Sequence, residues 1–188
     1  MIQERLKALR AEMEKRGITV YVVPTADFHE SEYVGDHFKA RKFITGFTGS
    51  AGTAVITLDE AGLWTDGRYF VQAENQLKDS TVTLYRMGEE GVPTVDEFVK
   101  DRLKEGGCLG FDGRVVNGTW GGKLEKIAAE KNVSMHVTED LIDLIWEDRP
   151  ALSKQPLFIL EEKYSGKSTA DKIADLRKAM KENGADVH

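Results

Sequence analysis

The stretch Glu4-Arg-Leu-Lys-Ala-Leu-Arg-Ala-Glu-Met-Glu-Lys-Arg-Gly-Ile-Thr-Val20 recurs near the end of the chain as Asp171-Lys-Ile-Ala-Asp-Leu-Arg-Lys-Ala-Met-Lys-Glu-Asn-Gly-Ala-Asp-Val187. Apolar residues at helical spacing, followed by a glycine, predict in each copy an amphipathic helix, its stop and the start of a buried strand. The matched positions, at one constant offset, are Leu6, Leu9, Arg10, Met13, Gly17 and Val20 with Ile173, Leu176, Arg177, Met180, Gly184 and Val187. The sequence therefore predicts one complete domain and the beginning of another.

The second copy stops where its strand should begin. In the first copy the strand continues as Val20-Tyr-Val-Val23, whereas only His188 follows Val187. Because so short a strand can neither pair nor pack, we expect the natural protein to continue beyond His188. We also expect chemistry to lie in that missing part.

The composition is typical of a soluble globular protein, with 40% hydrophobic and 31% charged residues among 188. The net charge is −6, and the basic residues are scattered among acids, so we expect no nucleic-acid partner. No apolar run approaches the roughly 18 residues of a membrane helix, and the N-terminus lacks the apolar core of a signal peptide. Cys108 is the single cysteine, which excludes an intrachain disulfide and indicates a reducing cytoplasm.

The order of the patterns predicts an α/β domain with a mixed sheet flanked by helices. Ile18 to Val23 is a continuous apolar run, typical of a strand covered on both faces, and Pro24 ends it. The turn Asp59-Glu-Ala-Gly62 predicts a hairpin, and Thr94 with Glu97 predicts a capping box. The expected helices span 2–16, 68–77, 95–103 and 120–131, with a last helical turn or two over 141–146. The expected strands span 18–23, 54–58, 63–65, 81–86, 108–111 and 134–137.

A polar stretch with two prolines, residues 147–156, is interpreted as a linker. We therefore expect a first domain over residues 1–150, with residues 151–188 forming the linker and the truncated start of a second, similar domain. Phe158-Ile-Leu160 would open that second domain, and Ser168 with Asp171 would cap its helix.

The first candidate motif is Asp27-Phe-His-Glu-Ser-Glu-Tyr33, which directly follows the first strand. Ends of parallel strands are where α/β folds place ligands. One interpretation takes His29, Glu32 and His37 as metal ligands, with His29 and Glu32 sharing a face if the segment is helical. The favoured interpretation is structural, with Asp27 capping a short helix and His29 bound to backbone, because zinc ligands are usually spaced more tightly.

The second motif is Gly46-Phe-Thr-Gly-Ser-Ala-Gly-Thr53. A phosphate-binding loop needs a helix start after its glycines, and here a β-branched strand follows without a lysine. The motif therefore predicts a close backbone crossing that only glycine tolerates.

The third motif is Leu63-Trp-Thr-Asp-Gly-Arg-Tyr-Phe70. Its Asp-Gly pair predicts a sharp turn that places Arg68 in the first turn of a helix, crowded by Trp64, Tyr69 and Phe70. Arg68 could pair with Asp66 or stack on a ring, or it could present its planar fork to a carboxylate or peptide carbonyl. Both alternatives stay open. The three motifs supply no nucleophile–base pair, and His136, in an expected strand, is interpreted as structural.

Taken together, Asp27-x-His29-x-Ser31-Glu32-Tyr33, Arg41-Lys-Phe-Ile-Thr-Gly-Phe-Thr-Gly-Ser-Ala-Gly-Thr53 and Leu63 to Phe70 resemble the N-terminal region of the Xaa-Pro aminopeptidases (aminopeptidase P). The likeness is to the long, three-domain type within the creatinase/prolidase group. The order and spacing of the blocks match over about the whole chain, and the repeat agrees with the tandem creatinase-like domains of that type.

The resemblance implies a cytoplasmic, homodimeric enzyme that removes an N-terminal residue preceding proline. Two manganese ions would sit in a pita-bread catalytic domain that is absent here, where they would activate a bridging water. No metal ligand is carried over, and this chain alone is expected to be inactive. Arg68 is carried over as a substrate-binding residue, with His29, Glu32, Asp66 and Tyr69 as candidates that shape the site.

Two other functions remain open. The chain could be a catalytically dead creatinase-like module that binds peptides or partners, or the N-terminal domain of an Xaa-Pro dipeptidase. The intact third motif favours the aminopeptidase, because a dead module has less need of a substrate arginine.

Overall fold

The computed structural model describes residues 2–187 of the chain. These residues fall into two compact units, which divide between Leu152 and Ser153. His188, at which the expected second strand breaks off, lies outside the described residues, and Val187 belongs to no strand.

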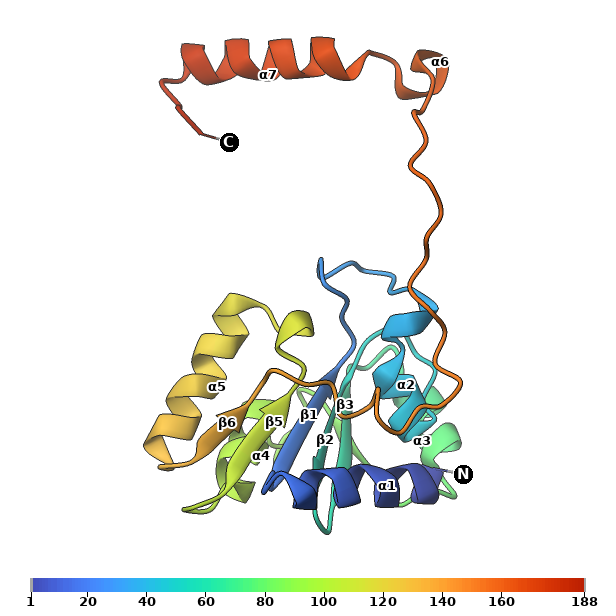
Figure 1. The fold of residues 1–188 in the computed structure, drawn as a ribbon, viewed down its shortest axis with the longest axis vertical. Helices are drawn as coiled ribbons and strands as arrows, with labels where there is room; N and C mark the ends of the chain where they lie inside the picture. The colour runs from blue at the N-terminus through green and yellow to red at the C-terminus, as the bar shows by residue number, and fades with distance from the viewer. Residues whose placement is uncertain (1, 188) are drawn as a thin grey trace. The chain divides into compact units, whose positions relative to one another are not determined.

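The first unit is built on a six-stranded mixed sheet with the order β4-β3-β2-β1-β5-β6 (Figure 1). β2 runs antiparallel to both of its neighbours, and the other pairings are parallel. Tyr21 of β1 pairs with Ile56 on one side and Gly110 on the other, so β1 is central. The strands are β1 (Val20–Pro24), β2 (Thr53–Thr57), β3 (Ala61–Thr65), β4 (Thr83–Arg86), β5 (Cys108–Phe111) and β6 (Ser134–His136).

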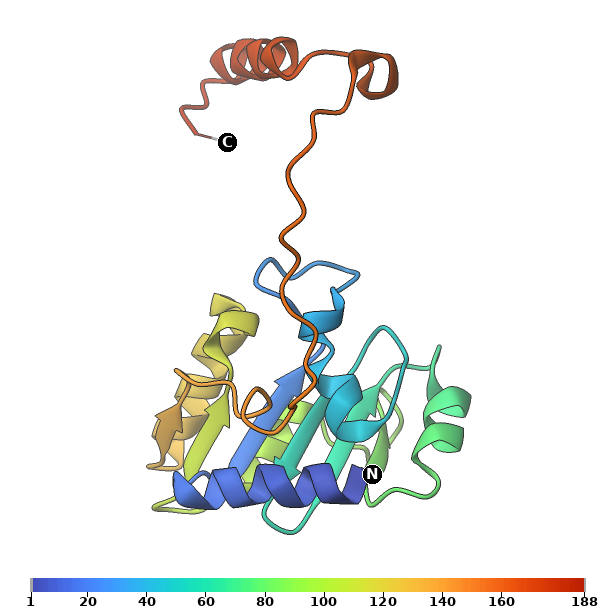
Figure 2. The same ribbon diagram turned by 45° about the vertical axis from the view of Figure 1, so that its right-hand side comes forward.

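Helices cover both faces of this sheet (Figures 1 and 2), which confirms the predicted fold class. One face carries α1, α2 and α3, and the opposite face carries α4 and α5. The helices are α1 (Ile2–Lys15), α2 (Ala40–Thr45), α3 (Phe70–Leu77), α4 (Val95–Arg102) and α5 (Gly118–Glu130), with 3-10 turns η1 (Asp36–Phe38) and η2 (Gly113–Val115).

The alternation of side chains along β1 explains why its apolar run is unbroken. Tyr21 and Val23 point into the core under α1 and α2, whereas Val20 and Val22 point into the core under α4 and α5. All five residues of β1 are buried. The prediction of a strand covered on both faces is therefore confirmed.

Several local predictions are confirmed. β2 and β3 form the expected hairpin, although the turn is shorter than expected because Ala61 already pairs with Ile56. The capping box holds, since the Thr94 side chain accepts a hydrogen bond from the Glu97 backbone and the Glu97 side chain accepts one from the Thr94 backbone.

Two helical segments differ from the expectations and one agrees. The helix expected from Arg68 begins only at Phe70. Residues 141–146 form the expected helical turns, with a hydrogen bond from Trp146 N to Ile142 O (3.0 Å). α2 was not expected at all, because six residues are too few to show an amphipathic period.

The second unit contains α6 (Glu162–Ser165) and α7 (Thr169–Glu182). The end of α7 has the same backbone structure as the end of α1, as the repeat predicts. Gly17 and Gly184 both end their helices with a positive φ, of 66° and 64°. After α1 the Ile18 amide donates to Met13 O, and after α7 the equivalent Ala185 amide donates to Met180 O, each over 2.9 Å. Ser168 caps α7 as predicted. Among residues 2–187, no helix is long and apolar enough to cross a lipid bilayer.

Candidate functional site

Loops from several strands meet at one edge of the sheet in the first unit. β1, β3 and β5 run in the same direction, so residues 25–35, 66–69 and 112–117 follow them at the same edge (Figure 1). The glycine-rich loop, residues 46–52, leads into the antiparallel β2 and therefore lies at this edge as well. All three motifs are thus gathered where α/β folds place ligands.

Two adjoining cavities open among these loops. The Arg41 cavity, named after one of its lining residues, has a volume of about 330 Å³. The Asp66 cavity, likewise named, has a volume of about 380 Å³. Thr25, Glu32 and Ser50 line both cavities. The structure therefore brings Glu32 and Asp66 to one cavity.

The loop after β1 is a turn and not the short helix that we expected. The Asp27 carboxylate accepts hydrogen bonds from the backbone amides of His29 and Ser31, both 2.9 Å long, which lowers the pKa of Asp27. Asp27 is thus a cap, as interpreted, but it caps a turn and not the short helix that we expected. Without a helix, His29 and Glu32 do not share a helical face.

The three candidate metal ligands are not brought together. His29 lines a separate hollow beside Arg114, whereas Glu32 lines the two cavities above. His37 Nδ1 lies 2.8 Å from the carbonyl oxygen of Pro150. Within residues 2–187 there is no group of three His, Cys, Asp or Glu side chains placed to hold a metal ion.

The glycine-rich loop crosses its neighbours as closely as predicted. A Cβ atom on Gly49 would lie 2.2 Å from Cζ of Phe47, and one on Gly52 would lie 2.8 Å from the carbonyl oxygen of Trp64. Gly46 ends α2 with a φ of 79°. These contacts confirm that the glycines serve a tight backbone path.

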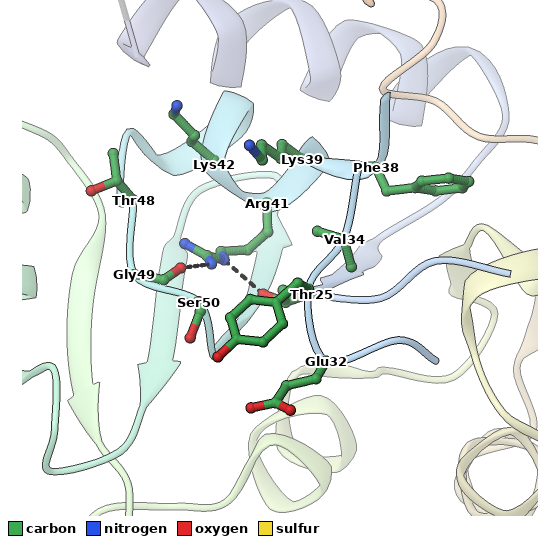
Figure 3. A pocket seen from close by; sticks show the side chains of 11 residues that line it. Thr25, Glu32, Val34, Phe38, Lys39, Arg41, Lys42, Thr48, Gly49 and Ser50 are labelled. Atoms are coloured by element: carbon green, nitrogen blue, oxygen red, sulfur yellow. Dashed lines mark hydrogen bonds between the residues drawn. The ribbon is translucent and has the colours of Figure 1, made fainter. Parts of the chain in front are cut away.

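A buried arginine for which no sequence pattern predicted a role holds this loop (Figure 3). Arg41, on α2, is 3% exposed. Its Nε donates to Thr25 Oγ1 (3.0 Å), and its terminal nitrogens donate to the carbonyl oxygens of Phe47 (2.6 Å) and Gly49. Burial lowers the pKa of the Arg41 guanidinium to about 10, so the group is charged at neutral pH.

Other side chains bind further polar groups of the loop backbone. Thr65 Oγ1 donates to the carbonyl oxygen of Ala51 (2.8 Å), and Thr25 Oγ1 donates to that of Gly52 (2.7 Å). An irregular loop next to a buried core needs such partners for its backbone groups. The loop is therefore a fixed part of the site.

Arg68 lies in the turn before α3, with its side chain 67% exposed. Its fork pairs with Asp66 through Nε–Oδ1 (2.8 Å) and Nη2–Oδ2 (2.9 Å), and its guanidinium carbon lies 5.2 Å from the ring centre of Tyr69. The paired charges raise the pKa of Arg68 and lower the pKa of Asp66. Both local contacts considered for Arg68 are thus present together.

The three aromatic residues expected around Arg68 lie in three different places. Trp64 is fully buried and packs under α4, on the opposite face of the sheet from α3. Phe70 lies under the guanidinium of Arg86 instead (5.3 Å). Tyr69 alone stays beside Arg68, and its hydroxyl oxygen lies 2.6 Å from Ser50 Oγ, a hydrogen bond that lowers the pKa of Tyr69.

The sequence matches known protein-family models along nearly its whole length. Residues 5–145 match the creatinase/prolidase N-terminal domain, and residues 148–188 match a second model with the same description. A Sordaria macrospora protein named as a probable Xaa-Pro aminopeptidase P is 44% identical over 97% of this chain and 30% of its own length. Arabidopsis thaliana aminopeptidase P2 is 39% identical over 98% of this chain and 26% of its own. The chain thus spans less than a third of these curated relatives.

Solved structures agree with the sequence matches. The Caenorhabditis elegans X-prolyl aminopeptidase, described as a cytosolic enzyme with a di-nuclear active site, superposes with a TM-score of 0.86 and 33% identity. The match covers 99% of this chain and 32% of that one. The N-terminal domain of the Mycobacterium tuberculosis peptidase PepQ superposes with a TM-score of 0.53 at 24% identity over 76% of this chain and 98% of that one, which shows a shared fold.

Proposed function

Because the chain belongs to the creatinase/prolidase N-terminal domain family, we propose that it is the N-terminal region of an Xaa-Pro aminopeptidase, which removes a residue preceding proline. The observation that carries this proposal is the 44% identity to a probable Xaa-Pro aminopeptidase P over 97% of the chain. The 0.86 TM-score to the C. elegans enzyme over 99% of the chain supports it.

The domain organisation proposed here follows from the repeat. Residues 1–150 form one creatinase-like domain, and residues 151–188 form a linker and the start of a second. The matching helix ends at Gly17 and Gly184 support this division, as does the separate family match over residues 148–188.

The chemistry belongs to a catalytic domain outside the described residues. We propose that two manganese ions act there, in line with the di-nuclear site of the C. elegans relative. Residues 2–187 offer no donor set for such ions, so no step of the reaction is assigned to them. This region shapes the approach of peptides with proline at the second position, in a cytosolic homodimer.

Arg68 is the residue of this region that contacts the substrate. Its fork is exposed and already holds a carboxylate, that of Asp66, in bidentate geometry. An exposed ion pair is weak because water and salt screen it, so a peptide carbonyl or carboxylate can replace Asp66 at little cost. Asp66 thereby keeps Arg68 oriented in the absence of substrate.

Hydrolysis of matched peptides by the full-length protein tests the proposed function. We expect release of the first residue from Xaa-Pro-Yaa peptides, no release from Xaa-Ala-Yaa controls, loss of activity in chelator and recovery with Mn²⁺. The 188-residue chain alone should be inactive. No cleavage would support a binding module instead, and cleavage of Xaa-Pro dipeptides only would support a dipeptidase.

A further inference from the structure

The Asp-Gly-Arg turn that holds Arg68 occurs a second time at the same edge of the sheet. After β5, Arg114 pairs with Asp112 through Nε–Oδ1 (2.9 Å) and Nη2–Oδ2 (3.0 Å), and its backbone amide donates to Oδ1 (3.0 Å). In the turn after β3 the corresponding distances for Arg68 and Asp66 are 2.8, 2.9 and 3.1 Å. The bond lengths of the ion pair therefore do not distinguish Arg68 from Arg114, although the Asp112 side chain is 10% exposed and the Asp66 side chain is 38% exposed.

The ring beside each arginine does distinguish them. The ring centre of Phe28 lies 5.2 Å from the guanidinium carbon of Arg114, and Phe28 packs on Phe38. Tyr69, at the same distance from Arg68, contacts the glycine-rich loop instead. The ring of Tyr69 packs edge-on against Phe47, with the ring centres 5.9 Å apart and the planes at 80°. The guanidinium carbon of Arg41 lies 4.7 Å from the ring centre of Phe47. A continuous series of cation–ring and ring–ring contacts thus runs from the buried Arg41 to the exposed Arg68.

Hydrogen bonds hold the same series in place. Arg41 donates to the carbonyl oxygens of Phe47 and Gly49, and Ser50, the next residue, bonds to the Tyr69 hydroxyl over 2.6 Å. Gly49 lies against both rings, since a Cβ atom on it would be 2.2 Å from Phe47 and 2.9 Å from Tyr69. The loop and the rings are therefore linked both by packing and by hydrogen bonds.

Burial of the charged Arg41 side chain costs free energy, and its contacts with the loop explain why an arginine is present there. A buried charge is unfavourable unless it is paired, and no carboxylate lies within ion-pair distance of Arg41 among the described residues. Lysine could not hold the same contacts, because a single ammonium lacks the planar fork that reaches three acceptors in fixed directions. Arg41 is thus suited to fixing the shape of a loop.

We propose that Arg41, Phe47, Ser50 and Tyr69 form a pedestal that fixes the position of Arg68 against the peptide substrate. Arg41, Ser50 and Tyr69 are positioning residues that act through Arg68 and do not touch the substrate. This inference rests on the proposed function, in which Arg68 contacts the peptide. It goes further by assigning the glycine-rich loop a role in substrate binding.

A double-mutant cycle in the full-length protein tests the pedestal. Tyr69→Phe removes only the hydroxyl, and we expect it to lower kcat/KM on an Xaa-Pro peptide about 3- to 10-fold, mainly through KM. In an Arg68→Ala background the same change should have no further effect, because there is no longer an arginine to position. Tyr85→Phe, the same change on the opposite face of the sheet, is the control and should leave kcat/KM within about 2-fold.

Two further variants ensure that the test does not depend on the folding of a single variant. Ser50→Ala removes the other half of the hydrogen bond and should reproduce Tyr69→Phe. Arg41→Lys should lower kcat/KM more than Ser50→Ala does, and this loss should also vanish in the Arg68→Ala background. Each variant is compared only after its melting temperature shows that it is folded.

The outcomes separate the pedestal from the proposed function. If Arg68→Ala lowers kcat/KM but the Tyr69→Phe loss persists in full beside it, the pedestal is wrong and the role of Arg68 stands. If Arg68→Ala leaves kcat/KM unchanged while peptides are cleaved, both the assignment of Arg68 and the pedestal are overturned. If no Xaa-Pro peptide is cleaved at all, the proposed function fails, and the pedestal fails with it.

Discussion

The indole ring of Trp64 stacks on the phenol ring of Tyr85, with the ring centres 4.1 Å apart and the planes 2° from parallel. Phe98 packs edge-on against both rings, and the indole nitrogen of Trp64 donates to the carbonyl oxygen of Pro93 (2.7 Å). Although Trp64 is only four residues from Arg68, it therefore supports the core under α4 and is unavailable to a ligand.

Truncation of Trp64 should destabilise the fold severely. Trp64→Ala removes a fully buried ring and leaves a cavity, so we expect the free energy of unfolding to fall by roughly 3–5 kcal/mol. Trp64→Phe keeps an aromatic ring and should lose less. Urea unfolding followed by circular dichroism measures both, and an unchanged midpoint for Trp64→Ala would contradict the stacked, buried geometry.

Asp140 and Asp143 offer a matched pair, because both bind the same guanidinium. Arg149 Nη1 lies 2.6 Å from Asp140 and 3.0 Å from Asp143, but the Asp140 side chain is 5% exposed and the Asp143 side chain is 62% exposed. Asp140→Asn removes the buried partner and leaves Arg149 with the exposed, water-screened Asp143, so it should cost about 3 kcal/mol. Asp143→Asn should cost less than about 1 kcal/mol.

The two aspartate variants are compared by thermal and urea unfolding of the chain. Equal losses would show that burial does not govern this ion pair. A loss confined to Asp143→Asn would show that Arg149 relies on its exposed partner.

Tyr21 should make stability depend on alkaline pH. Its hydroxyl accepts a hydrogen bond from the Leu141 amide (2.9 Å), and burial, with Asp140 nearby, raises the pKa of Tyr21. In the unfolded chain the phenol ionises near its ordinary pKa of about 10, whereas the folded protein keeps it neutral. The folded state then binds more protons, so the stability that Tyr21 supplies is complete below pH of about 10 and declines above it.

Comparison with Tyr21→Phe isolates this effect from other titrating groups. The variant leaves the Leu141 amide unpaired, at a cost of about 1–3 kcal/mol near pH 8. Between pH 8 and pH 11 the difference in free energy of unfolding between the two proteins should narrow by about 1.4 kcal/mol. A difference that stays constant would mean that Tyr21 ionises equally in both states.

Features set by contacts between near neighbours could be predicted from the sequence. The capping box at Thr94 and Glu97 and the glycine stops at Gly17 and Gly184 depend on hydrogen bonds within a few residues. The burial of β1 on both faces followed from its unbroken apolar run. Such signals are local, so they do not need the tertiary structure.

The central part of the site could not be predicted in this way. Arg41 sits on a helix too short to show a period, and its partners are mainly backbone carbonyls, which every residue carries. The position of Arg68 before the helix depends on the Asp66 carboxylate, which accepts the Arg68 amide hydrogen and keeps this residue in a turn. The face on which Trp64 lies could have been predicted from the sequence. Side chains alternate along β3, so Trp64 and Leu63 point to opposite faces of the sheet.

The role of Arg68 is tested by comparing Arg68→Ala with Arg114→Ala in the full-length protein. Both changes remove an exposed arginine that forms the same bidentate contacts in an Asp-Gly-Arg turn, at the same edge of the sheet. Asp112 is more buried than Asp66, so each variant is compared only after its melting temperature shows that it is folded. We predict that Arg68→Ala lowers kcat/KM on an Xaa-Pro peptide about 10²-fold, whereas Arg114→Ala changes it less than about 2-fold. Equal effects of the two variants, or an unchanged kcat/KM for Arg68→Ala, would contradict the role of Arg68 in binding the substrate.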